Sequence, residues 1–207
     1  SFRTLQRRPR AAERKLKLPA TALDPKTALV VIDLQNALAK YPTVHPMADV
    51  IANAARLADA FRRAKLPVVL VTVGFAPDGA DRVQTRTEVP QRAFPADPDA
   101  WRVVPELGPK AGDLSITKRQ WSAFYGTDLD LQLRRRHVTG VVLAGVATSV
   151  GVDTTARAAH ERAYNLTFAS DAMSDMDPAA HDFALKKVFP RIGEIDTTDA
   201  ILGLLRR

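Results

Sequence analysis

The sequence predicts a single α/β domain built as a three-layer, doubly wound, mainly parallel sheet. Three continuous runs of apolar, largely β-branched residues indicate the sheet, at 27–33, 67–73 and 139–146. Such runs are typical of parallel strands, which are buried on both faces. Segments with helical apolar periodicity lie between the runs, and this alternation puts helices on both faces of the sheet. A chain of 207 residues, 46% of them hydrophobic, is long enough for one such core.

Weaker segments complete the predicted order of elements. Further short strands are expected at 116–118, 165–170 and 191–196. Helices are expected at 47–65, at 129–136 after a Thr127–Asp128 cap, at 149–163, and from Pro178 onward. Residues 74–114 interrupt the alternation of strands and helices, because they contain six prolines and little periodicity. A long insertion of this kind usually forms a lid, a binding loop or an interface.

Charge divides the chain into a basic arm, residues 1–24, and a domain, residues 25–207. The net charge is +7, and the first 17 residues account for all but one unit of it. We therefore expect a solvated arm, or one packed on a neighbouring subunit, and no nucleic-acid-binding surface. No run of 18 apolar residues occurs, so we expect no membrane span. The sequence contains no cysteine, which excludes disulfides and thiol chemistry and fits a cytoplasmic location.

Ligands of a doubly wound sheet bind at the carboxyl ends of its strands. That rule selects Asp33, Gly74, Lys118, the segment 146–151 and Asp171. Asp33 ends an apolar strand, so its carboxylate must be solvated, paired or used in chemistry, or must cap a helix. Segment 146–151 leads from a strand into a helix, whose first backbone N–H groups can hold an oxyanion.

Three motifs at these positions resemble the isochorismatase-like hydrolase superfamily, which includes many cysteine amidohydrolases. VVIDLQN (30–36) is similar to its first-strand motif, which carries an acidic residue. KRQWSAFYGTDLDLQLRRR (118–136) is similar to its lysine motif, and AGVATSVGVDTTARAA (144–159) to its nucleophile segment. Asp171–Ala172 and His181 also fall where similar sequences carry them. The resemblance covers nearly the whole chain after the arm.

The resemblance implies a site of Asp, Lys and Cys, in which Asp33 is the aspartate and Lys118 the lysine. Gly151 stands at the position of the cysteine, so the chain resembles a subgroup with glycine there. A cis peptide before Ala147 and an oxyanion hole formed by the amides near Ala147 and Gly151 are also implied. True isochorismatases lack the thiol too, but they carry a tyrosine where Ala147 stands, so isochorismate is not the expected substrate. The residues expected to line the pocket are Gln35, Trp121, Phe124 and Thr148.

These features predict a hydrolase without a cysteine nucleophile that acts on a small-molecule substrate. Because Gly151 has no side chain, covalent thioester chemistry is excluded. Asp33 would handle protons, as acid or as base, and Lys118 would stabilise developing negative charge. The alternative is a catalytically inactive relative that serves as a small-molecule binding protein or an oligomeric scaffold. In either case we expect a homodimer or homotetramer, since similar proteins commonly self-associate.

A serine triad is a competing interpretation of segment 147–151. Ser149, Asp171 and His181 occur in hydrolase chain order, but the first glycine of G-x-S-x-G is Ala147 here. The four histidines form no H-x-H or H-x-x-x-H pair, so we expect no metal site, and we expect no cofactor.

Overall fold

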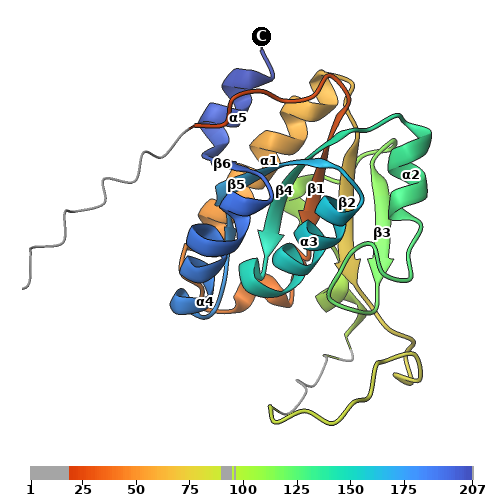
Figure 1. Ribbon diagram of the computed structural model, residues 1–207. Coiled ribbons are helices and arrows are strands. Elements are labelled where there is room, and N and C mark those ends of the chain that lie inside the picture. Colours follow the sequence, from red (N-terminus) through yellow and green to blue (C-terminus); the bar gives the residue numbers. More distant parts are fainter. Residues whose placement is uncertain (1–18, 90–94, 96, 207) are drawn as a thin grey trace, which may run out of the picture.

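The computed structural model describes residues 19–89, 95 and 97–206 and confirms the predicted fold class (Figure 1). Six parallel strands form one sheet in the order β3–β2–β1–β4–β5–β6. Their bounds are β1 Thr27–Ile32, β2 Val68–Val73, β3 Leu114–Lys118, β4 Gly140–Val146, β5 Asn165–Ser174 and β6 Glu194–Asp196. The helices are α1 Met47–Arg63, α2 Leu129–Arg135, α3 Asp153–Glu161, α4 Pro178–Phe183 and α5 Thr198–Leu204.

Helices cover both faces of the sheet because successive side chains of a strand point to opposite faces. On one face, Leu29 and Val31 of β1 belong to an apolar cluster with residues of α1 and α5. On the other face, Val30 and Ile32 belong to a second cluster with residues of α2 and α3. Helix α1 buries the predicted stripe, which comprises Val50, Ala54, Leu57, Ala58 and Phe61.

The strand order reverses beside β1, which lies between β2 and β4. A doubly wound sheet binds ligands at such a point, outside the carboxyl ends of the strands. Strands β1 and β4 approach closely there, because a Cβ atom on Gly145 would lie 2.0 Å from the carbonyl oxygen of Ile32. Gly145 also has a φ of 112°, so both space and backbone conformation require glycine. This close approach brings the residues after β1 next to those after β4.

Two expectations from the sequence are corrected. Strand β5 runs to Ser174, not to residue 170, because it pairs with β4 again after a register shift, with Val146 opposite Ser174. Asp171 therefore lies inside the strand and not at its carboxyl end. The helix expected at 149–163 begins instead with a π-helical turn, Thr148–Val152, which continues into α3.

The proline-rich insertion contains two short 3-10 helices, Pro98–Trp101 and Pro105–Leu107. Figure 1 shows residues 74–89 extending beyond the carboxyl edge of the sheet. Of the predicted arm, residues 1–18 lie outside the described part, whereas Ala20 and Thr21 hydrogen-bond to carboxylates of β6. Within the described residues, no helix has both the length and the apolar character to cross a membrane.

Candidate active site at the carboxyl edge of the sheet

Asp33 and Lys118 meet at the carboxyl edge of the sheet, from the strands on either side of β2. Lys118 Nζ lies 2.8 Å from Asp33 Oδ2, and the two side chains are only 3% and 9% exposed. Asp33 has a φ of 53°, in the left-handed region, which aspartate tolerates better than most residues. Its N–H donates to the carbonyl of Val71, and its carbonyl accepts from the N–H of Gln35, both at 2.9 Å. This sharp turn after β1 directs the Asp33 carboxylate toward Lys118.

The Asp33 carboxylate is paired at one oxygen only. Oδ2 contacts Lys118, whereas the buried Oδ1 has no hydrogen-bond partner among the described residues. Burial raises the pKa of Asp33 to about 6, because the loss of hydration outweighs the charge and the hydrogen bond of Lys118, which lower it. A carboxyl group with this pKa changes its protonation state close to neutral pH, which suits a group that transfers protons.

Lys118 is held by two acceptors. Besides Asp33, its ammonium group donates to the carbonyl of Gln120 at 3.2 Å. An ammonium group has three N–H donors, so one donor remains beyond these two contacts. The cation is therefore fixed in position and still able to bind a further acceptor.

Gly151 lies against the same carboxylate. A Cβ atom on Gly151 would lie 3.4 Å from Asp33 Oδ2, 3.0 Å from Ile32 Cγ2 and 3.2 Å from the carbonyl oxygen of Val146. The peptide bond between Val146 and Ala147 is cis. The carbonyl of Ala147 accepts hydrogen bonds from the amides of Val150 and Val152, both at 3.1 Å. These two bonds fix the turn that follows the cis peptide. The structure thus brings Asp33, Lys118 and Gly151 together.

The four residues expected to line the pocket have different environments. Gln35 is fully buried, and its side-chain amide bonds to the backbone of Val73 and Trp101, so it ties β1 to β2 and the insertion. Thr148 is buried and its hydroxyl lies 2.9 Å from His181 Nδ1.

The two aromatic residues differ from each other as well. Phe124 lies in the apolar core, with its ring 5.9 Å from that of Tyr164. Trp121 is 65% exposed, and its contact with a ligand stays a prediction.

Sequence reasoning missed a polar cluster beneath the turn at 147–151. Asp175 Oδ2 accepts from the N–H of Ser149 at 2.7 Å, and the rings of His45 and His181 meet edge to face with centroids 5.0 Å apart. Burial, and secondarily the nearby His45, lower the pKa of His181, which favours the neutral ring. Ser174 Oγ accepts from the N–H of His45 at 2.8 Å. The sequence signal that could have revealed this cluster was the apolar pair Ala172–Met173, which extends β5 to Ser174 and places Asp175 directly after the strand.

The described residues do not form the serine triad considered above. His181 bonds to Thr148, and Asp171 Oδ1 accepts from the N–H and the hydroxyl of Thr198 at 2.7 and 2.8 Å. In the described part of the chain, no three His, Asp or Glu side chains gather in a group that could hold a metal ion.

Known proteins resemble this chain in sequence and in fold. Residues 27–200 match the isochorismatase domain family. The chain belongs to the isochorismatase family. Its relatives include an uncharacterised isochorismatase family protein, YwoC, of Bacillus subtilis, which is 44% identical over 86% of this chain and 93% of its own length. Ureidoacrylate amidohydrolase RutB of Methylobacterium radiotolerans is 30% identical over 90% of this chain and 83% of its own.

Solved structures of the family share this fold. An isochorismatase family protein from Burkholderia thailandensis superposes with a TM-score of 0.87 at 44% identity, over 90% of this chain and 98% of its own. N-carbamoylsarcosine amidase from Thermoplasma acidophilum gives a TM-score of 0.67 at 30% identity, over 84% and 97% of the two chains. Family members thus include hydrolases of small molecules, and this chain shares their architecture without containing a cysteine.

Proposed function

We propose that this isochorismatase-family protein is a hydrolase that works without a thiol, with Asp33 as general base and Lys118 as the stabilising cation. The observation that carries the proposal is the state of Asp33. Its Oδ1 is buried with no hydrogen-bond partner among the described residues, and its pKa is raised to about 6. A buried, unpartnered acceptor is costly to keep, so a role in accepting a proton explains why it stands there.

The proposed substrate is a small molecule with an amide or ureido carbonyl. Support comes from two relatives at 30% identity, one named for ureidoacrylate and the other for N-carbamoylsarcosine. Gly151 is proposed to occupy the position of the family cysteine, so water replaces the thiol as nucleophile. Because a Cβ atom at Gly151 would lie 3.4 Å from Asp33 Oδ2, a nucleophile near this glycine would also lie near the base.

In the proposed reaction, the Asp33 carboxylate takes a proton from water as the water oxygen bonds to the carbonyl carbon. The carbonyl electrons move onto the carbonyl oxygen, where the remaining N–H of Lys118 and the amides of Ala147 and Gly151 stabilise the negative charge. When the carbonyl re-forms, the carbon–nitrogen bond breaks and Asp33 returns the proton to the leaving nitrogen. The products are a carboxylic or carbamic acid and an amine.

The test starts with a panel of amides and N-carbamoyl acids and compares the parent with Asp33→Asn on any substrate that is hydrolysed. We expect Asp33→Asn to lower kcat/KM by about 10²- to 10⁴-fold. Asp171→Asn is the matched control, because its carboxylate bonds to Thr198 in α5 and should change kcat/KM less than threefold. Equal rates for the parent and Asp33→Asn would contradict the proposal.

The pH profile of the parent distinguishes base from acid. A general base must be ionised, so kcat/KM should rise with pH and reach half of its plateau near pH 6. A fall in kcat/KM through the same pH would assign Asp33 as the acid. A compound that raises the melting temperature of the protein but is never turned over would favour the non-catalytic binding protein instead.

We also propose a homodimer or homotetramer. Trp121 and Tyr125 expose 65% and 67% of their surface on the segment after Lys118, and exposed aromatic side chains are enriched in protein interfaces. Light scattering that detected only monomer would contradict this state. A cytoplasmic location stays a prediction.

A further inference from the structure

A surface cavity lies at the amino edge of the sheet, away from Asp33. It has a volume of about 550 Å³ and is lined where β2 and β3 begin, at Val68 and Leu114, and by Lys26 just before β1. Asp33 and Lys118 stand at the other ends of these strands. A strand rises about 3.3 Å per residue, so the cavity is roughly 20 Å from the candidate active site. A ligand here would not contact Asp33.

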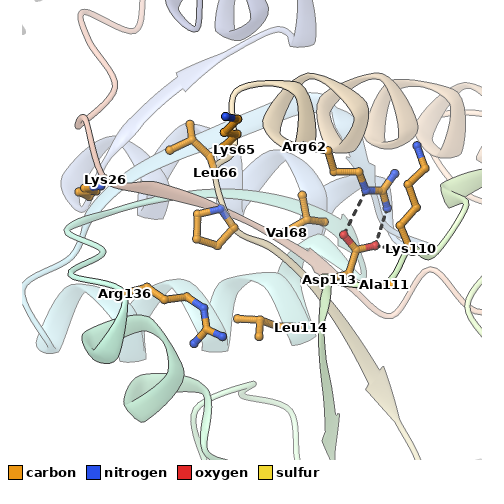
Figure 2. Close-up of a pocket in the computed structure, with 12 residues that line it drawn as sticks. Lys26, Arg62, Lys65, Leu66, Val68, Lys110, Ala111, Asp113, Leu114 and Arg136 are labelled. Atoms are coloured by element: carbon orange, nitrogen blue, oxygen red, sulfur yellow. Dashed lines mark hydrogen bonds and ion pairs between the residues drawn. The ribbon is translucent and has the colours of Figure 1, made fainter.

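The side chains around this cavity carry an excess of positive charge (Figure 2). Asp113 is the one carboxylate among its described lining residues, and it is matched by Arg62, whose Nη2 lies 2.7 Å from Oδ2. Lys110 pairs with Asp59 at 3.2 Å. The Arg62–Asp113 pair forms one side of the cavity in Figure 2, and its charges cancel.

Three lining cations have no counter-ion among the residues that the structure describes. Lys26, Lys65 and Arg136 are exposed, and none forms an ion pair with a carboxylate of the described residues. The guanidinium of Arg136 is held by two bonds to Gln132, to its carbonyl at 2.9 Å and to its side-chain oxygen at 2.8 Å. In Figure 2, Arg136 and Leu114 lie across the cavity from Lys65 and Leu66. Three unmatched cations favour a multiply charged anion.

The floor of the cavity is apolar. The apolar residues that line the cavity between the cations are Leu66, Pro67, Val68 and Leu114. A volume of this size falls within the range of small-molecule sites, which combine apolar walls with a few polar groups that orient the ligand. The cavity is also larger than a bare inorganic anion requires, so the apolar floor is suited to an organic part of the ligand.

We propose that this cavity binds a small organic phosphate, with its phosphate groups near Lys26, Lys65 and Arg136 and its organic body on the apolar floor. A terminal phosphate carries close to two negative charges at neutral pH, and arginine binds phosphate oxygens in a bidentate manner. The site is separate from the proposed hydrolytic centre and does not depend on that proposal.

The test is calorimetric titration of the full chain with adenosine diphosphate at constant ionic strength. We compare the double variant Lys26→Ala/Arg136→Ala with Lys187→Ala/Arg191→Ala. The second variant removes the same two residue types from exposed positions outside the cavity. We expect saturable binding to the parent, a Kd about tenfold or more weaker in the cavity variant, and less than a twofold change in the control. Pyrophosphate, which lacks an organic body, should bind more weakly than adenosine diphosphate.

Several results would overturn the proposal. One is the absence of saturable binding to the parent, and another is equal affinity of the two double variants. Binding that is lost in Asp33→Asn but retained in Lys26→Ala/Arg136→Ala would show that the ligand binds at the carboxyl edge of the sheet and not in this cavity. Pyrophosphate that binds as tightly as adenosine diphosphate would refute the role of the apolar floor.

Discussion

Two ion pairs, the buried Asp33–Lys118 and the half-buried Asp113–Arg62, lie at opposite edges of the sheet and differ in how completely their carboxylates are bonded. Asp33 and Asp113 are each 9% exposed at the side chain, and each lies within 2.8 Å of a cation. Asp113 uses both oxygens: Arg62 donates to Oδ1 at 3.1 Å and to Oδ2 at 2.7 Å, and the N–H of Lys110 donates to Oδ2 at 2.8 Å. Asp33 uses one oxygen and leaves the other without a partner among the described residues.

This difference indicates that the Asp113–Arg62 pair has a structural role, whereas the Asp33 carboxylate can still bind a ligand or a proton. A bidentate arginine satisfies a carboxylate with fixed geometry, whereas a lysine meets it at one point. The single contact of Lys118 does not compensate for the burial of Asp33, whose pKa consequently rises to about 6. An incompletely satisfied carboxylate costs stability, and it remains available to a ligand.

Among the changes that test this comparison, Lys118→Met should have the largest effect, and the effect is on catalysis. This change removes the charge that lowers the pKa of Asp33 and a proposed donor to the oxyanion, so kcat/KM at pH 7 should fall by about 10²- to 10³-fold. The midpoint of the pH profile should also move above 6. Lys118→Arg retains the charge and should recover part of the activity. A pH midpoint that does not move in Lys118→Met would show that the two side chains do not act as a pair.

Breaking the Arg62–Asp113 pair with Arg62→Leu should lower the free energy of unfolding of the protein. Arg62 and Asp113 are half-buried, so breaking this pair should cost less than breaking a fully buried one, about 1–3 kcal/mol. Urea unfolding measures it. The control is Arg157→Leu, which breaks an exposed i,i+4 pair with Asp153 and should cost less than about 1 kcal/mol. Similar losses for the two variants would mean that the Asp113 bonds add nothing beyond a surface pair.

The stability of Asp33→Asn relative to the parent should rise with pH. The folded-state pKa of about 6 exceeds the ordinary 3.8, so the stability cost of ionising Asp33 is absent well below pH 3.8, grows between pH 3.8 and 6, and is constant above that range. Each pKa unit corresponds to about 1.4 kcal/mol, so the stability of Asp33→Asn relative to the parent should increase by about 3 kcal/mol between pH 3 and pH 8. Asparagine also tolerates the left-handed backbone at this position. A difference that stays constant with pH would contradict the raised pKa.

The smallest effect is expected at Gly151. An added Cβ meets Ile32 Cγ2 at 3.0 Å and the Val146 carbonyl at 3.2 Å, so Gly151→Ala should lower the free energy of unfolding by about 1–2 kcal/mol. Gly203 in α5 is the control, because nothing lies within 4 Å of its added Cβ and Gly203→Ala should stabilise by about 0.5–1 kcal/mol. If Gly151→Ala costs nothing, Gly151→Cys becomes a simple way to introduce a thiol beside Asp33.

The sequence by itself determined the fold class and the pair at the centre of the candidate site. The three long apolar runs coincide with β1, β2 and β4, because a parallel strand buried on both faces permits few polar residues. The weaker segments coincide with β3, β5 and β6, although β5 extends further than expected. Asp33 directly follows β1 and Lys118 ends β3, so their meeting at one edge follows from the parallel topology.

Only the tertiary structure decided the features that depend on contacts between distant segments. The second pairing of β5 with β4 moved Asp171 into the strand, ended the strand at Ser174 and placed Asp175 directly after it. Phe124, within a motif that also carries exposed Trp121, was assigned to the core by packing against Tyr164. The pKa of Asp33 is likewise a balance between burial and one lysine, and burial is a property of the folded chain and not of any sequence motif.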